Sequence, residues 1–156
     1  MAKTATRLVN IEAEDTGLAI LKFKNGALGV IEATTATRPK NLEGTISILG
    51  EKGSVEIGGF FMNELKTWNF ADPDEMDNDI WDKHVKVPDE LAWNYTEFFK
   101  DVINSLRNDK KGLIDGLEGR KSVELINAIY ESAETGKELF LCFAPRKCRL
   151  GIINDK

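Results

Sequence analysis

The sequence predicts an α+β fold: a mostly antiparallel open sheet with two long helices packed on one face, and the other face used for oligomerisation. Strand-like segments fill the first half of the 156 residues and two helical patterns follow them, without β-α-β alternation. The first predicted strand is apolar on both sides, which is typical of a strand that is buried on both faces.

Apolar, β-prone segments bounded by turn residues predict five strands in the first half of the chain, at residues 17–24, 27–33, 45–49, 54–57 and 60–70. Asn25-Gly26 separates the first two strands, and this dipeptide is a strong hairpin signal because both positions of the turn need positive φ. Gly50 to Gly53 is expected to turn the chain between the third and fourth strands.

The second half is expected to contain an acidic loop at 72–82, a short edge strand at 84–87, two helices at 88–108 and 115–135, and a last strand at 138–143. Apolar residues recur every three or four positions in both helical segments. Asp115 followed by Glu118 resembles a capping box, and Gly136 is placed where a helix end needs positive φ.

The first predicted strand carries Leu18 and Ile20 on one side and Ala19, Leu21 and Phe23 on the other. Two helices can cover one face of the sheet, so the apolar residues of the second face need another partner. We therefore expect a homo-oligomer, a dimer or larger, that associates through the open sheet face.

The composition excludes several classes of protein. Apolar residues make up 42% and charged residues 30%, the ordinary mix of a soluble globular protein without a membrane segment. A net charge of −5 argues against nucleic acid as a partner. Two cysteines, Cys142 and Cys148, are too few for a disulfide scaffold, and the first residues lack a signal-peptide core, so a cytoplasmic location is expected.

The familiar catalytic and cofactor motifs are missing from the sequence. There is no G-x-G-x-x-G after a strand, no phosphate-binding P-loop, no zinc spacing and no nucleophile elbow. The acidic run that begins at Asp72 fails the calcium-loop pattern, because its sixth position is Asp77 and its twelfth is Lys83. His84 is better explained as a surface histidine than as a catalytic group. We expect no catalytic, cofactor or metal site.

The segment 34–41 is the candidate binding site. It follows a buried strand, is rich in hydroxyl groups and contains Arg38, whose planar guanidinium suits a carboxylate or a phosphate. Thr35, Thr37 and Asn41 are the other candidate substrate-binding residues. The same composition fits a plain polar connection equally well.

Three segments together resemble the C-terminal domain of the Gfo/Idh/MocA family of NAD(P)-dependent oxidoreductases. They are EDTGLAILKFKNGALGVIEATT (14–35), EGTISILGEKGSVEIGG (43–59) and IDGLEGRKSVELINAIYESAETGKE (114–138). NELKTW (63–68) is similar to the branch that acts on nucleotide-linked amino sugars or their uronic acids. The resemblance implies a lead-in segment at 1–13, a substrate and oligomerisation domain at 14–143 and a tail at 144–156.

The resemblance implies that a full-length family member begins with a Rossmann domain, which binds NAD or NADP. It also implies that a lysine of an E-K-P motif and a histidine serve the proton transfer. This sequence has neither the Rossmann half nor E-K-P, and it has Ala92-Trp93 where many members have Gly-His. No catalytic residue is therefore carried over.

Two functions follow from the resemblance. In the first, the chain is the substrate-side and oligomerisation domain of a sugar or sugar-nucleotide dehydrogenase and is inactive alone. In the second, it is a stand-alone, non-enzymatic assembly or binding module with the same fold. The fold itself does not choose between them, because function depends on the site.

Overall fold

The computed structural model describes residues 1–85 and 91–142, which form two compact units. One unit contains Met1–Ala36 together with the described chain from Lys111, and the other contains Thr37–Lys110. The described strands form two three-stranded antiparallel sheets, so the expectation of a single sheet is wrong. The α+β class is confirmed, with three helices in the described residues instead of the two predicted.

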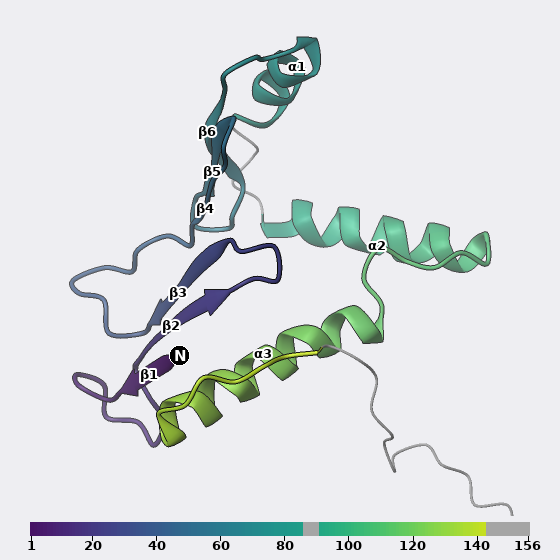
Figure 1. Cartoon of the computed structure of the whole chain (residues 1–156). Helices are drawn as coiled ribbons and strands as arrows, with labels where there is room; N and C mark the ends of the chain where they lie inside the picture. Colours follow the sequence, from purple (N-terminus) through teal and green to yellow (C-terminus); the bar gives the residue numbers. More distant parts are fainter. Residues whose placement is uncertain (86–90, 143–156) are drawn as a thin grey trace, which may run out of the picture. The chain divides into compact units, whose positions relative to one another are not determined.

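The sheet of the first unit has the order β1-β2-β3 (Figure 1), with β1 at Ala2–Ala5, β2 at Thr16–Lys22 and β3 at Leu28–Thr34. The predicted hairpin is confirmed, but only Gly26 has a positive φ, of 92°, and Asn25 does not, so the expectation of positive φ at both positions is wrong. The Gly26 N–H donates to the Phe23 carbonyl oxygen at 2.9 Å. The polar strand β1 was not predicted, because AKTA carries no apolar alternation.

Helix α3 (Gly116–Thr135) packs on β1, where Ala2 is buried. Both predicted ends of this helix are confirmed. The Asp115 side chain caps the N-terminus by accepting from the Glu118 N–H at 2.9 Å, and Gly136 ends the helix in the left-handed conformation at φ 67°. The side-chain bond from Glu118 back to Asp115, which would complete a capping box, is not among the contacts of this N-cap.

The two faces of the first sheet differ in exposure. Ala19 of β2 is 3% exposed, whereas Leu18 and Ile20 on the opposite face are 47% and 62% exposed. Ile20 pairs with Val30 of β3, which is also exposed, so the apolar side chains of the two strands lie side by side. Of the two faces considered in the sequence analysis, the exposed one is therefore the face that carries Leu18 and Ile20.

The sheet of the second unit has the order β4-β5-β6, with β4 at Ile46–Leu49, β5 at Gly53–Gly58 and β6 at Glu64–Phe70. The fifth predicted strand begins later than expected, at Glu64, because Gly59 (φ 89°) and Met62 (φ 55°) form a turn. Leu65, which is 6% exposed, is the buried apolar residue of this sheet.

The expected acidic loop at 72–82 and the expected edge strand at 84–87 are wrong, because helix α1 (Glu75–His84) occupies this part of the chain. Asp74 and Asp77 form a capping box, and acidic groups are favourable at a helix N-terminus. The helix packs on β6, where the Trp68 indole N–H donates to Asp77 Oδ1 at 2.9 Å. Lys86 and Val87 lie outside the described residues.

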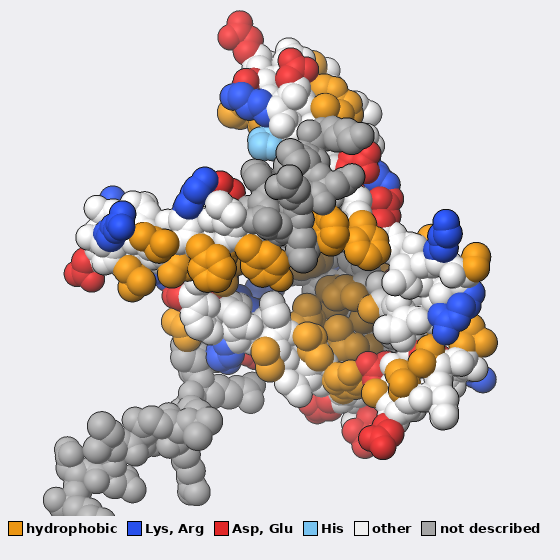
Figure 2. Space-filling model, turned by 180° about the vertical axis from the view of Figure 1, so that it is seen from behind, with side chains coloured by type: hydrophobic (Ala, Val, Ile, Leu, Met, Phe, Trp, Pro, Cys, Tyr) orange, Lys and Arg blue, Asp and Glu red, His pale blue; other side chains and the backbone are white. Residues whose placement is uncertain are grey.

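Helix α2 (Leu91–Arg107) confirms the end of the first predicted helix to within a residue, while its expected start at Pro88-Asp89 lies outside the described residues. Hydrophobic side chains gather along this helix (Figure 2), and they are exposed: Tyr95, Phe98, Phe99, Ile103 and Leu106. Of the two long helices in the described residues, α3 packs on the first sheet, and α2 belongs to the other unit.

The last strand predicted at 138–143 is absent from the described part of that range, 138–142, and Phe143 and the tail at 144–156 lie outside it. Among the described residues, no helix is both long and apolar enough to cross a membrane.

Candidate functional site: a loop anchored by a buried carboxylate

The Asp15 carboxylate, 2% exposed, organises the start of the first unit. Its Oδ2 accepts hydrogen bonds from the backbone N–H groups of Arg7, Leu8 and Val9 at 2.8, 2.7 and 3.0 Å. Its Oδ1 accepts from the Thr16 hydroxyl at 3.0 Å. The backbone N–H bonds, first those of Leu8 and Val9, hold the pKa of the Asp15 carboxyl well below its usual range, because they stabilise the charged form.

Asp15 also anchors the end of β3, where the candidate loop begins. Its main-chain oxygen accepts from the Thr35 N–H at 2.8 Å and from the Thr34 hydroxyl at 3.0 Å. Thr34 Oγ1 lies 2.9 Å from Thr16 Oγ1 and accepts from the Ala36 N–H at 3.0 Å. The Thr35 amide is thus tied to Asp15, which directly precedes β2, and the Ala36 amide is tied to Thr34 at the end of β3.

The next part of the loop belongs to the second unit and is closed by its own contacts. The Thr37 hydroxyl donates to Asn41 Oδ1 at 3.3 Å, and Arg38 Nη1 donates to the Thr37 carbonyl oxygen at 2.7 Å. Arg38 and Asn41 are exposed. The structure therefore brings together three of the four predicted site residues, while Thr35 belongs to the first unit.

The chemistry of this loop is that of an anion and sugar receptor. A guanidinium offers several N–H donors in one plane, which matches a carboxylate or phosphate, and hydroxyl and amide groups exchange hydrogen bonds with sugar hydroxyls. Such groups suit the holding and orienting of a ligand.

Glu14 forms a second polar contact of the first unit, with α3. The Tyr130 hydroxyl donates to Glu14 Oε1 at 2.5 Å. This bond lowers the pKa of the Glu14 carboxyl and raises that of the Tyr130 hydroxyl, because it stabilises the carboxylate and the protonated phenol together.

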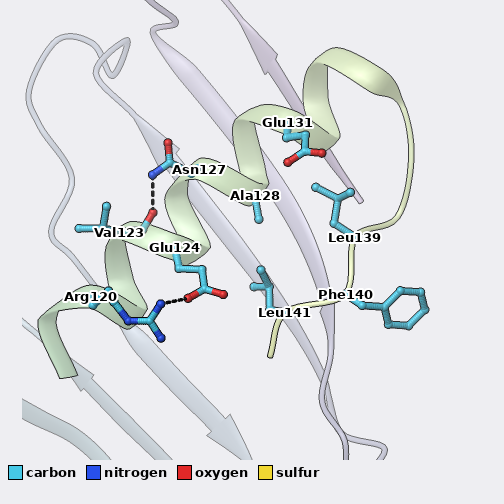
Figure 3. Close-up of a pocket in the computed structure, with 9 residues that line it drawn as sticks. All are labelled: Arg120, Val123, Glu124, Asn127, Ala128, Glu131, Leu139, Phe140 and Leu141. Carbon is cyan, nitrogen blue, oxygen red and sulfur yellow. Dashed lines mark hydrogen bonds and ion pairs between the residues drawn. The ribbon is translucent and has the colours of Figure 1, made fainter. Parts of the chain in front are cut away.

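A groove of about 540 Å³ runs along α3 in the same unit (Figure 3) and is lined by Arg120, Val123, Glu124, Asn127, Ala128, Glu131, Leu139, Phe140 and Leu141. Leu139 and Leu141 point toward the helix, whereas Phe140 points away from it. Arg120 Nη1 donates to Glu124 Oε2 at 2.8 Å, and the Asn127 amide donates to the Val123 carbonyl oxygen at 2.8 Å. Two of the charged groups that line the groove, Arg120 and Glu124, are thus paired with each other.

Within residues 1–85 and 91–142, no group of three or more histidine, cysteine or acidic side chains is arranged to hold a metal ion. His84, the last residue of α1, is exposed, and the acidic run belongs to the same helix and its N-cap.

Asp15 was not expected from the sequence, and Thr34 was included in the candidate segment 34–41 without its anchoring role. The burial of Asp15 and the contacts of both residues depend on β2 pairing with both β1 and β3, which no local pattern reveals. The available signal is weak: an Asp-Thr pair at the start of an apolar strand, where aspartate commonly bonds to nearby backbone N–H groups.

Comparison with known proteins places these features in a wider context. Residues 2–141 match the model of the Gfo/Idh/MocA oxidoreductase family, C-terminal alpha/beta domain. A search of curated proteins found no match.

Two solved structures are similar to this chain. The WlbA dehydrogenase from Bordetella pertussis, solved in complex with NADH and UDP-GlcNAcA, is 43% identical with a TM-score of 0.79, over 87% of this chain and 39% of that one. The WlbA dehydrogenase from Chromobacterium violaceum, in complex with the same two molecules, is 44% identical with a TM-score of 0.73, over 87% of this chain and 37% of that one. This chain therefore spans about two fifths of the length of these dehydrogenases.

Proposed function

This chain belongs to the Gfo/Idh/MocA oxidoreductase family as its C-terminal α/β domain, and from that premise we propose that it forms the substrate side of an NAD-dependent sugar-nucleotide dehydrogenase. The observation that carries the proposal is the identity of 43% and 44% to two dehydrogenases solved with NADH and UDP-GlcNAcA. The proposed substrate is UDP-GlcNAcA or a close relative of it.

The loop chemistry supports an anionic sugar substrate. UDP-GlcNAcA carries a diphosphate and a sugar carboxylate, and either group suits the planar donors of Arg38. Thr35, Thr37 and Asn41 supply hydroxyl and amide groups for the sugar or its nucleotide. In this proposal the residues bind and orient the substrate, and the hydride is exchanged with a nicotinamide that another domain holds.

The described residues do not fit the nicotinamide cofactor itself. A dinucleotide pyrophosphate binds where a glycine turn exposes free N–H groups at a helix N-terminus. At α1 and α3, the carboxylates of Asp74 and Asp115 already accept from these N–H groups, so a pyrophosphate would meet negative charge.

The proposal includes self-association through the exposed face of the first sheet. Four aliphatic side chains lie on this face of β2 and β3: Leu18, Ile20, Leu28 and Val30. A second copy that presents the same face would bury these side chains in an isologous contact.

NMR of the ¹⁵N-labelled chain tests substrate binding, because shifts of individual amides detect weak binding and locate it. We expect UDP-GlcNAcA to shift the amides of residues 35–38, 40 and 41 in a saturable way, and to do so at lower concentration than UDP-GlcNAc, which lacks the carboxylate. No saturable shift at millimolar ligand, or shifts confined to other residues, would rule out this substrate wall and favour the non-enzymatic assembly module.

A fluorescence titration tests the cofactor part of the proposal. Because no phosphate-binding glycine turn is present, we expect NADH to show no saturable binding to the chain at micromolar concentrations. Saturable micromolar binding would contradict this part, and the substrate part would still stand or fall by the NMR titration.

A further inference from the structure

The contacts around Asp15 form a connected chain that ends at the first amides of the candidate loop, and all of its members belong to the first unit. We infer that Asp15, Thr16 and Thr34 are positioning residues, a hydrogen-bond relay that holds Thr35 and Ala36 in the geometry that binds substrate. The inference rests on the proposed function, because the relay matters only if the same loop binds the substrate.

The direction of the relay follows from the number of protons that each group can donate. A carboxylate only accepts, so the Thr16 hydroxyl gives its single proton to Asp15 Oδ1 at 3.0 Å. In the 2.9 Å contact between the two threonine hydroxyls, Thr16 can then only accept. The Asp15 charge therefore sets the orientation of the Thr16 hydroxyl and leaves its oxygen as an acceptor that faces Thr34.

Thr34 connects these contacts to the loop through its hydroxyl oxygen. Its proton points toward the Thr16 hydroxyl oxygen or the Asp15 main-chain oxygen, which is 3.0 Å away. In either case a lone pair of Thr34 Oγ1 stays directed at the Ala36 N–H, 3.0 Å away. The Thr35 N–H bonds directly to the Asp15 main-chain oxygen at 2.8 Å. Two successive loop amides are thus held by one buried acidic residue and its partners.

If these residues only stabilised the sheet, the hydroxyl hydrogen bonds from Asp15 to the loop would not be needed. A strand end can be held by backbone pairing alone, and Thr16 and Thr34 are already partners in the β2–β3 register. The hydroxyl contacts add a bond beyond the ladder, to the amide of Ala36, which lies outside β3. Their effect should therefore be local to the loop and separable from the stability of the sheet.

Substitutions that remove or restore single hydroxyl groups test the relay. Thr34→Val and Thr16→Val keep a β-branched shape without the hydroxyl, Thr34→Ser keeps the hydroxyl, and Thr4→Val is the matched control in β1 of the same sheet. For each variant, amide hydrogen exchange at Ala36, the dissociation constant for UDP-GlcNAcA by NMR titration, and the urea midpoint of unfolding are measured.

We expect Thr34→Val to speed exchange at Ala36 by about tenfold, the scale of one net hydrogen bond, and to weaken UDP-GlcNAcA binding by about threefold or more. Thr16→Val should cause a smaller change in the same direction. Thr34→Ser should restore both properties to within about twofold, the spread usual for a conservative surface change. The urea midpoints of Thr34→Val and Thr4→Val should agree.

The outcomes separate this inference from the function on which it rests. Faster exchange at Ala36 with unchanged UDP-GlcNAcA binding, or unchanged exchange in Thr34→Val, would overturn the positioning role and leave the proposed function standing. Failure of serine to restore binding would also overturn it, because the hydroxyl would not be the active group. If the unaltered chain does not bind UDP-GlcNAcA, the proposed function fails and the positioning role fails with it.

Discussion

Arg38 and Asp15 show two different uses of charge at the scale of single residues. Arg38 is exposed in the loop, with Nη1 bonded to the neighbouring Thr37 carbonyl oxygen, so its guanidinium is held near the backbone. Asp15 is buried, and backbone N–H groups surround it. The first charge suits a ligand in solvent, whereas the second organises the chain itself.

Exchanging Arg38 for lysine tests the ligand role of the guanidinium. Arg38→Lys keeps the charge but loses the planar pair of donors, so it should weaken UDP-GlcNAcA binding by about 1–3 kcal/mol, the range of a charge-assisted hydrogen bond. Lys40→Arg in the same loop is the matched control and should leave the affinity unchanged. NMR titration measures both, and equal affinity of Arg38→Lys and the unaltered chain would exclude Arg38 from the site.

Asp15 predicts how stability changes in acid. Its pKa is lowered in the folded chain, so its contribution is present above its ordinary pKa of 3.8 and is lost as the pH falls through and below that value. Asp15→Asn should therefore lower the urea midpoint at pH 7 and flatten its decline from about pH 5 downward.

The control for this substitution is Asp82→Asn, which changes an exposed carboxyl of α1. Urea unfolding of the three proteins between pH 3 and pH 7 makes the comparison. A decline as steep in Asp15→Asn as in the unaltered chain would show that another carboxyl carries the acid sensitivity.

Ser132 links three segments at the scale of secondary-structure elements. Its hydroxyl oxygen accepts from the Ala2 N–H of β1 at 3.1 Å, and its hydroxyl donates to the Lys137 carbonyl oxygen beyond the helix at 2.7 Å. Ser132 is 4% exposed and Ala2 is 3% exposed, so the Ala2 N–H cannot exchange this bond for one to water. One side chain therefore joins the strand, the end of α3 and the segment that follows it.

Removing the Ser132 hydroxyl should destabilise the first unit. Ser132→Ala leaves the buried Ala2 N–H without an acceptor, at a cost of about 1–3 kcal/mol. Ser122→Ala, at an exposed position of α3, is the matched control and should lie within about 0.5 kcal/mol of the unaltered chain. Urea unfolding measures both, and equal midpoints for the two variants would refute the linking role.

Exposed apolar surface is the dominant property of the whole chain. Large hydrophobic side chains are exposed on one face of the first sheet and along α2, while three apolar residues of the described chain are buried: Ala2, Ala19 and Leu65. Soluble monomers rarely leave contiguous apolar patches uncovered. The chain is therefore expected to cover these surfaces by association.

Sedimentation equilibrium at micromolar concentration tests the association. We expect a homodimer or a larger assembly, and Ile20→Lys should shift it toward monomer because the charge would be buried in the contact between copies. Lys52→Gln, at an exposed position of the turn between β4 and β5, is the control and should leave the assembly intact. A clean 17.4 kDa monomer of the unaltered chain would mean that its apolar faces are covered in another way.

The sequence by itself determined the features that depend on local backbone preferences and on family resemblance. Asn25-Gly26 predicted the first hairpin, and Asp115 and Gly136 predicted both ends of α3, because turn and cap geometry is decided within a few residues. The segments 14–35, 43–59 and 114–138 predicted the family, and the family match over residues 2–141 confirms it.

The tertiary structure alone decided what depends on contacts between distant parts of the chain. In the part of the chain that the structure describes, six strands divide into two sheets, and polar β1 joins the first sheet, because pairing partners rather than propensity select these arrangements. The acidic run forms α1, since Asp77 both caps this helix and accepts from Trp68 of β6. The burial of Asp15 and its link to Thr34 likewise exist only once β1 and β3 flank β2, because an isolated segment leaves such a carboxylate bonded to water.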